Sequence, residues 1–494
     1  MTSTFDGDFN PISRLFNFLV SALSEYNPFM KSKDFMEWFD DRKRVHNFVI
    51  EEIPFSDLEK WSFDNETGNL GHDSGKFFSI EGVKVSTNFG SIESWTQPII
   101  NQPEIGILGI ITKNVDGILY FLMQAKMEPG NINLIQLAPT LQATKSNFTR
   151  VHEGKSPPYI EYFQDKSKSK TLLNVLQSEQ GARFLRKRNQ NIIVEVDDEL
   201  PILDDYCWLT LGQIHKILRM DNIVNMDART VLSCIPFGDP SLANRQVSNL
   251  ISALRKSIPA SAIGANQPRY SDDLVASILD TQSHLHTTDE IISWFTDLKM
   301  KYELEVESIP LNDVRGWTKS AMDIHHNEGK YFSVIACRVE ADSREVSNWT
   351  QPLVKAREQG IIAMLIKRIN GVFHFLVQAK VEPGNFDILE MAPTVQCITG
   401  SYNDAPEGGR PPFLDYVLNA NEDKIRFSTL QSEEGGRFFQ EENRNIVIEV
   451  EDDFPEEIPA NFKWMTMSQI KEFIKYNNFV NVQCRCLIGS LSLI

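Results

Sequence analysis

The chain has 494 residues, which is too many for one small domain. Hydrophobic residues make up 41% and charged residues 23%, so a disordered or collagen-like protein is excluded. The formal net charge of −18 argues against a broad surface for nucleic acid or for anionic membranes. A local basic pocket for an anionic small molecule is compatible with this charge.

The N-terminal sequence MTSTFDGDFN lacks the basic segment and apolar run of a signal peptide, and no apolar run reaches the ~20 residues of a membrane helix. The six cysteines include no CxxC pair, which favours a reducing environment. We therefore expect a cytoplasmic protein without a membrane or nucleic-acid partner. The nine histidines include no HExxH motif, and we expect no metal site.

One unit occurs twice in the chain. Trp38-Phe39 recurs as Trp294-Phe295, and FLMQAKMEPGN from Phe121 recurs as FLVQAKVEPGN from Phe375, with nine of eleven positions identical. Repetition on this scale dictates the architecture. We expect an N-terminal repeat over 1–235, a linker rich in Pro, Gly, Ser and Asn over 236–268, and a C-terminal repeat over 269–494.

Helical patterns appear in both units. The first covers residues 34–42, and its counterpart begins with the capping box formed by Thr287 and Glu290. Further helices are predicted over 181–188 and 209–219. Each repeat therefore needs a sheet that these helices can cover.

The sheet is predicted by a hairpin in each unit. Two β-rich apolar runs flank Asp116-Gly117 within residues 106–126, and a second pair flanks Asn370-Gly371. The runs are apolar on both strand faces, which is typical of a sheet covered on both sides. The predicted fold class is α+β, as a tandem duplication of mixed α/β domains.

Polar side chains appear where the second strand of each hairpin ends. Residues two apart on a strand share a face, so Lys and Glu of the QAK-EPGN block emerge together just before a Pro-Gly turn. A buried Lys-Glu pair with Gln capping the turn explains this pattern as well as a functional site does. The residues concerned are Gln124, Lys126, Glu128 and Asn131, repeated as Gln378, Lys380, Glu382 and Asn385.

A second candidate cluster is the block LQSEQGARF, repeated as LQSEEGGRF. Glycines before an Arg could bring backbone N–H groups and a cation to a phosphate, although a plain helix start with acidic residues is an equal interpretation. The candidates here are Arg183, Glu433 and Arg437.

The WTQP block of each unit offers the flat face of a tryptophan, on which a base could stack. A Trp next to Pro is more often part of the core. The candidates are Trp95 and Gln97 in the first unit and Trp349 and Gln351 in the second.

The two units differ in residues that follow Gln142 and Gln396. The first unit has Arg150 and His152 there, where the second has uncharged or acidic residues, and the second has Tyr402 where the first has Phe148. Arg344 of the second unit stands opposite Gly90 of the first. Two pockets of different charge suggest two ligand sites with different roles.

Several long motifs occur along both units: GKFFSIEGVKV, WTQPII, FLMQAKMEPGN, LAPTLQATKSNFTRVH and VLQSEQGARF in the first, and REVSNWTQPL, FLVQAKVEPGN, MAPTVQC and LQSEEGGRFF in the second. In these motifs the chain strongly resembles the NDP-hexose 2,3-dehydratases of deoxysugar biosynthesis. The resemblance extends from about Trp38 to Cys486.

This resemblance implies a homodimer whose subunit is a tandem pair of Nudix-like domains without the Nudix metal box. It implies a lyase that converts dTDP-4-keto-6-deoxyglucose to dTDP-3,4-diketo-2,6-dideoxyglucose without a cofactor. It also implies dTDP binding in both repeats, with one site catalytic and one auxiliary. A Nudix-type hydrolase and a non-catalytic sugar-nucleotide binding protein are the alternatives.

Such a reaction needs a base for the C3 hydrogen, donors for the enolate oxygen and an acid for the departing C2 hydroxyl. We expect the C-terminal repeat to supply them from Glu382, Lys380, Tyr402 and Arg344. The rival N-terminal set is Glu128, Lys126, Arg150 and His152. The expected substrate-binding residues are Trp95, Gln97, Gln124, Asn131, Gln142, Arg150, Arg183, Trp349, Gln351, Gln378, Asn385, Gln396, Glu433 and Arg437.

Overall fold

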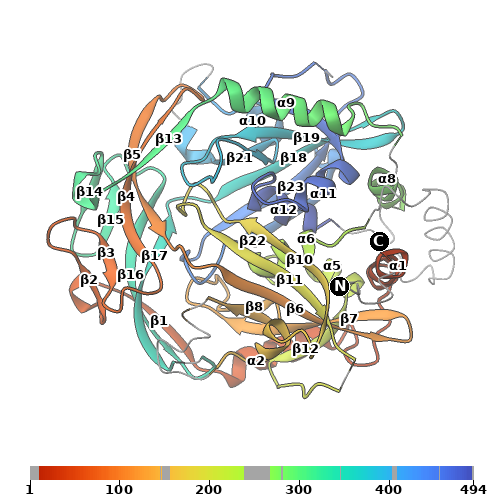
Figure 1. Ribbon diagram of the computed structural model, residues 1–494, viewed down its shortest axis with the longest axis horizontal. Helices are drawn as coiled ribbons and strands as arrows, with labels where there is room; N and C mark the ends of the chain where they lie inside the picture. The colour runs from red at the N-terminus through yellow and green to blue at the C-terminus, as the bar shows by residue number, and fades with distance from the viewer. Residues whose placement is uncertain are drawn as a thin grey trace, which may run out of the picture.

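The computed structural model describes residues 11–144, 146, 156–197, 199–237, 268–279, 282–344, 346–402, 409–455 and 457–491. These residues form two copies of one mixed α+β arrangement (Figure 1). The expected α+β class and its duplication are therefore confirmed. Most of the expected linker, residues 238–267, lies outside the described residues.

Each repeat contains a seven-stranded sheet built around the predicted hairpin. In the first, the strands follow the order β10 (Lys170–Ser178), β11 (Arg188–Glu195), β6 (Gly106–Val115), β7 (Ile118–Met127) and β12 (Tyr206–Thr210), with β8 (Ile135–Ala138) beside β7 and β9 (Leu141–Ala143) beside β6. Only the β11–β6 pair is parallel among these neighbours. Asp116 and Gly117 both have positive φ, as the tight turn between β6 and β7 requires.

The second sheet repeats this order. Its strands are β22 (Ile425–Ser432), β23 (Glu442–Glu449), β18 (Gly360–Ile369), β19 (Val372–Lys380) and β24 (Phe462–Thr466), with β20 (Glu390–Ala392) beside β19 and β21 (Val395–Ile398) beside β18. The predicted turn at Asn370-Gly371 joins β18 to β19.

Helices cover these sheets and close their ends. They are α1 (Pro11–Ala22), α2 (Phe35–Val45), α4 (Glu161–Gln164), α5 (Leu211–Ile217), α6 (Met226–Ser233), α8 (Pro268–Leu279), α9 (Thr288–Lys301), α10 (Leu414–Leu418), α11 (Met467–Ile474) and α12 (Val482–Gly489). Short 3-10 helices are η1 (Phe55–Asp57), η2 (Leu311–Asp313), η3 (Thr399–Tyr402) and η4 (Glu422–Lys424). No described helix has the length and apolar character needed to cross a membrane.

Some of the predicted helices are confirmed, and one is not. The helix predicted over 34–42 is α2, and the predicted capping box at Thr287 is present at the start of α9. The helix predicted over 181–188 is wrong. The backbone of Arg183 and Leu185 instead bonds to Ile100 in a strand-like bridge, so tertiary pairing overrides the local pattern.

Two smaller sheets are each completed by a strand from the other repeat. β13 (Leu304–Ile309) joins the order β13, β4 (Ser79–Thr87), β3 (Leu70–His72) and β2 (Trp61–Phe63), with β5 (Ser94–Asn101) beside β4. Reciprocally, β1 (Phe48–Ile53) joins the order β1, β16 (Phe332–Ala341), β15 (Asp323–His326) and β14 (Trp317–Lys319), with β17 (Asn348–Ala356) beside β16. Figure 1 shows this exchange on its left side.

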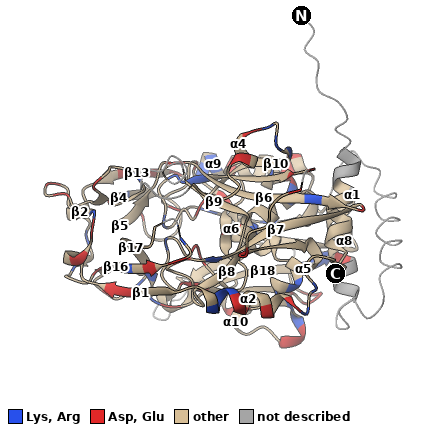
Figure 2. Cartoon of the chain, turned by 90° about the horizontal axis from the view of Figure 1, so that it is seen from below, with Lys and Arg blue, Asp and Glu red and all other residues tan. Residues whose placement is uncertain are grey.

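The apolar core is continuous between the repeats. One cluster contains Phe121 and Leu209 of the first repeat together with Phe375 and Met465 of the second. Figure 2 shows charged residues mainly on outer helices and loops, whereas β6, β7 and β18 carry few of them. The two repeats therefore share buried surface.

The Pro-Gly turn of each QAK-EPGN block contacts the opposite repeat through its backbone. Gly130 N donates to Gly435 O at 2.7 Å, and Gly384 N donates to Gly181 O at 2.7 Å. A Cβ on Gly130 or Gly384 would lie 1.6 Å from a backbone oxygen of the opposite repeat. Only glycine fits at either position.

Substituting Gly384→Ala should therefore lower the free energy of unfolding by roughly 2–4 kcal/mol, because the added methyl forces this backbone contact apart. Equilibrium urea unfolding measures the change. Gly71→Ala is the matched control, since a Cβ there meets nothing within 4 Å. Equal unfolding midpoints for the two variants would contradict the interpretation.

Candidate functional site

Lys126 and Glu128 lie side by side at the end of β7, as the strand spacing predicts. Both are buried, and Lys126 Nζ lies 3.4 Å from Glu128 Oε1. Gln142 Nε2 donates to the same oxygen at 3.0 Å, while Glu128 Oε2 is buried without a hydrogen-bond partner. The floor of this site is a carboxylate oriented by one cation and one amide.

The second repeat has an equivalent floor, in which the lysine makes a different contact. Gln396 Nε2 donates to Glu382 Oε1 at 2.9 Å, and Lys380 Nζ donates to Gln396 O at 2.8 Å. Burial raises the pKa of the Glu382 carboxyl, and the nearby charges of Lys380 and Arg183 oppose that shift. Gln378 is turned to the backbone, where its Nε2 donates to Pro393 O at 2.8 Å.

An asparagine holds each of these glutamines. Asn225 Nδ2 donates to Gln142 Oε1 at 3.2 Å, and Asn481 Nδ2 donates to Gln396 Oε1 at 2.8 Å. Both asparagines also cap a helix, α6 and α12 respectively. Neither asparagine was predicted as a site residue, although both occur at the same place in their units, which was a usable signal.

The QSE-G-RF block of each repeat lies against the floor of the other repeat. Gly181 and Arg183 lie by Glu382, where the Gly181 backbone N–H and the Arg183 charge both act on its carboxyl. Burial lowers the pKa of Arg437, and the charges of Glu434 and Glu128 oppose this shift. Each candidate site is thus built from both repeats, which the sequence analysis did not anticipate.

Asn131 and Asn385 hold the two Pro-Gly turns in place. Asn131 Nδ2 donates to Leu134 O at 3.2 Å, and a Cβ on Gly435 would lie 2.0 Å from Asn131 Oδ1. A Cβ on Gly181 would likewise lie 2.4 Å from Asn385 Oδ1. The structure places both side chains at the contact between the repeats.

The WTQP residues support the QSE-G-RF loops. Trp95 Nε1 donates to Gln97 Oε1 at 2.8 Å, and Gln97 Nε2 donates to Ala182 O at 3.1 Å. Trp349 and Gln351 repeat this contact, and Gln351 donates to Gly436 O at 3.0 Å. These side chains position the loops that carry Arg183 and Arg437.

Glu433 lies inside the same contact region. Its carboxylate accepts hydrogen bonds from Gln180 and Asn443, and burial together with the neighbouring Glu441 raises its pKa to about 7. Tyr402 ends η3 and is partly buried against the core of the second repeat, and this burial raises its pKa. Arg150 and His152 lie outside the described residues.

Arg344 lies in a different place from the one we expected. Its Nη1 donates to Met127 O at 2.9 Å, so it adjoins the N-terminal floor rather than Lys380, Glu382 and Tyr402. The strand exchange explains this position. Arg344 lies in the loop after β16, and β16 pairs with β1 of the first repeat. The structure therefore moves Arg344 to the N-terminal set.

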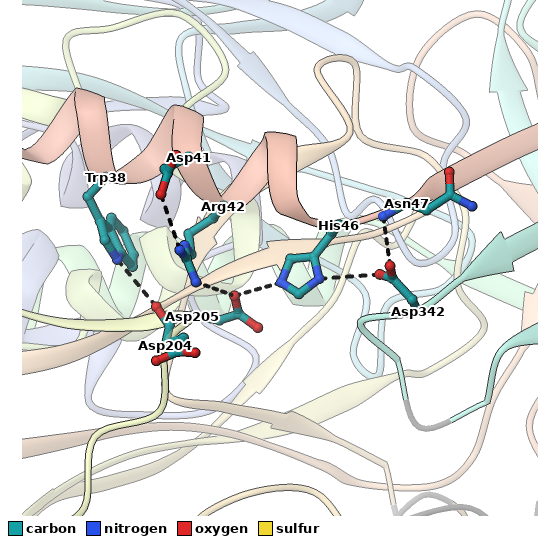
Figure 3. Close-up of polar contacts among 8 residues, drawn as sticks. All are labelled: Trp38, Asp41, Arg42, His46, Asn47, Asp204, Asp205 and Asp342. Atoms are coloured by element: carbon teal, nitrogen blue, oxygen red, sulfur yellow. Dashed lines mark hydrogen bonds and ion pairs between the residues drawn. The ribbon is translucent and has the colours of Figure 1, made fainter.

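A cleft lies beside this floor and is lined by Lys126 and Gln142, the two residues whose side chains contact Glu128. Its polar lining comes from both repeats, and the main residues are His46, Gln124, Lys126, Gln142, Asp205 and Arg344. His46 lies between two carboxylates: its Nε2 is 2.8 Å from Asp205 Oδ1 and its Nδ1 is 3.2 Å from Asp342 Oδ1 (Figure 3). The sequence analysis missed His46 because it occurs in only one of the two units.

The cleft combines the cations Lys126 and Arg344, the carboxylate of Asp205 and the imidazole of His46. Such a set suits an anionic ligand and a proton transfer. Among the described residues, no three His, Cys, Asp or Glu side chains are grouped to hold a metal ion.

Comparison with known proteins gives a consistent result. A family model described as NDP-hexose 2,3-dehydratase matches twice, over residues 32–235 and 288–491. A protein of Saccharopolyspora spinosa named dTDP-4-dehydro-6-deoxy-alpha-D-glucopyranose 2,3-dehydratase is 48% identical over 474 residues, which cover 96% of this chain and 94% of that protein. Proteins of the same name from Amycolatopsis orientalis and Streptomyces violaceoruber are 41% and 42% identical and cover 93% and 96% of their own lengths.

One buried carboxyl near the C-terminal floor gives a pH prediction. Glu390 accepts a hydrogen bond from Ser178 at 2.8 Å, and its burial raises its pKa from 4.5 to about 7. The matching position of the first repeat is Gln136, which accepts from Ser432 at 2.8 Å. The chain itself therefore shows that glutamine fits this position.

Because the folded state holds the Glu390 proton more tightly, stability from this group falls as pH rises from about 4.5 to about 7. Glu390→Gln should remove that loss and leave the variant more stable than the wild type at pH 8, by roughly 3 kcal/mol at most. Urea unfolding at pH 5 and pH 8 measures both differences. A difference that does not change with pH would contradict the prediction.

Proposed function

The chain belongs to the NDP-hexose 2,3-dehydratase family, and we propose that it removes water from dTDP-4-keto-6-deoxyglucose to give dTDP-3,4-diketo-2,6-dideoxyglucose. The observation that carries this proposal is the match to relatives of that name along nearly the whole of both chains. The duplicated Lys-Glu floors agree with it, because they offer a base and a cation in each repeat.

The reaction proceeds through an enolate. A base takes the C3 hydrogen, which the neighbouring C4 ketone makes acidic, and the electrons of the C3–H bond move towards the C4 oxygen. A cation or N–H donor stabilises the charge on that oxygen. The C2–O bond then breaks as its oxygen receives a proton, water leaves, and the resulting C3 enol becomes the second ketone. No oxidant is consumed.

We assign the base role to Glu128 or Glu382. Each carboxylate is buried and held on one oxygen by an amide. In Glu128 the other oxygen has no hydrogen-bond partner and remains for a substrate hydrogen. Lys126 or Lys380 is the cation nearest to it and serves the developing enolate. Gln124, Arg183 and Arg437 then remain for the sugar and the diphosphate.

Nudix-like domains, a homodimer, two nucleotide sites per chain and a cytoplasmic location complete the proposal. Support comes from the sheets with their central hairpins and from the presence of both floors in one chain. The six cysteines are all free, which suits a reducing compartment.

Incubation of the protein with dTDP-4-keto-6-deoxyglucose should yield a product lighter by one water, as measured by mass spectrometry. Activity should persist in EDTA. Release of a sugar phosphate and dTMP would instead identify a Nudix-type hydrolase, and binding without any change of the substrate would identify a binding protein.

Calorimetric titration with dTDP should give a stoichiometry near two per chain, because both repeats carry the complete QAK-EPGN and QSE-G-RF blocks. A clean stoichiometry of one would contradict the proposal of two nucleotide sites.

A further inference from the structure

The two repeats carry different residues above their equivalent floors. Ala125 N donates to Asp205 O and Ala379 N donates to Asn461 O, each at 2.8 Å, so Asp205 and Asn461 occupy the same position in the two repeats. The contacts with the opposite repeat also correspond. Asn47 N donates to Asp342 Oδ2, as Glu303 N donates to Asn88 Oδ1.

Three polar residues of the N-terminal cleft have no charged or imidazole counterpart. His46 is replaced by Tyr302, Asp205 by Asn461, and Arg344 by Gly90. At the C-terminal position, Tyr302 packs edge-on against Phe89, with ring centroids 4.9 Å apart. Histidine and its carboxylate partner are therefore present together in one repeat and absent together in the other.

The His46 ring is oriented on both sides. Asp205 Oδ1 lies by Nε2, and Asp342 Oδ1 lies by Nδ1 (Figure 3). Arg42 Nη1 lies 3.9 Å from the same Asp205 oxygen, and Asn47 N–H fixes the second carboxylate. Each ring nitrogen faces a carboxylate oxygen, so whichever nitrogen carries a proton has an acceptor beside it.

Of the two carboxylates beside the His46 ring, Asp342 at Nδ1 is the easier one for a substrate to displace. The side chain of Asp342 is 53% exposed, whereas that of Asp205 is 26% exposed. A substrate hydroxyl can take the place of Asp342 at Nδ1 while Asp205 continues to hold Nε2. Asp205 is then the positioning residue of the pair.

We propose that the dehydration takes place in the N-terminal cleft, where His46, held by Asp205, protonates the departing C2 hydroxyl. The inference rests on the proposed function and reverses our expectation that the C-terminal repeat carries the chemistry. The floor residues do not show which repeat is catalytic, because Lys126 and Glu128 recur as Lys380 and Glu382. The charged and imidazole residues above the floor do differ.

The proton balance closes with the groups present. Glu128 takes the C3 proton, the C3–H electrons form the enolate, and those electrons return to form the C2–C3 double bond as the C2–O bond breaks. His46 supplies the proton with which the hydroxyl leaves as water. The C3 enol then gives its O–H proton to His46 and receives a proton at C2 from Glu128, so the diketone forms and both groups return to their starting states. Lys126 and Arg344 are the cations beside this cleft that oppose the negative charge of the enolate and of the diphosphate.

His46→Gln tests the proposal, because glutamine can still hydrogen-bond to Asp205 but cannot transfer a proton. Its kcat should fall by about 10²-fold or more, while KM and the number of bound dTDP molecules stay within about threefold of wild type. Asp205→Asn, which introduces the residue found at Asn461, should lower kcat by about tenfold or more with the same retention of binding. Thermal unfolding followed by circular dichroism shows whether each variant is folded.

Tyr302→Phe is the matched control at the equivalent position, and its kcat should stay within about twofold of wild type. The inference is overturned if His46→Gln and Asp205→Asn both keep kcat within about fivefold. It is also overturned if kcat and dTDP binding fall together, since His46 would then be a binding or folding residue. If the wild-type chain itself removes no water from the substrate, the proposed function fails instead.

Discussion

The backbone contact between each Pro-Gly turn and the opposite repeat is the constraint on which the sites depend. Gly130 and Gly384 approach a carbonyl oxygen so closely that no side chain fits at either position. Glu128 and Glu382 precede these glycines by two residues, so the turns that the opposite repeat holds also fix the two carboxylates. A repeat on its own would lack both this contact and the strand that completes its smaller sheet.

The contacts of asparagine, glutamine and glutamate in the floor are the same in the two repeats, whereas residues above the floor have diverged. The chain from Asn225 through Gln142 to Glu128 is matched atom for atom by the chain from Asn481 through Gln396 to Glu382. A substitution of one member leaves the polar group that it contacts without this partner, at a cost of about 1–3 kcal/mol where that group is buried. At the cleft the two repeats differ, because His46 of the first repeat corresponds to Tyr302 of the second.

Local signals in the sequence predicted local structure well. The turn at Asn370-Gly371 and the capping box at Thr287 were predictable because the residues that form them are neighbours in the chain. The Gly181 segment was predicted as a helix and is a turn, because its backbone pairs with Ile100 far away in the sequence. Arg344 was placed with the wrong repeat for a related reason, since no local pattern reports a strand exchange. The floor residues were predictable because both repeats contain them, whereas His46 occurs in only one repeat and was not predicted.

Because of the strand exchange, part of the opening of each cleft is formed by the repeat that does not supply its floor. The loop that carries Asp342 and Arg344 belongs to the sequence of the second repeat, yet it completes the cleft of the first. Reciprocally, Asn88 and Phe89 of the first repeat lie against the second. A substitution in one of these loops therefore changes the opposite cleft and leaves the buried floor of its own repeat in place. After a duplication, this arrangement lets two initially equal sites acquire different chemistry without loss of the packing that both require.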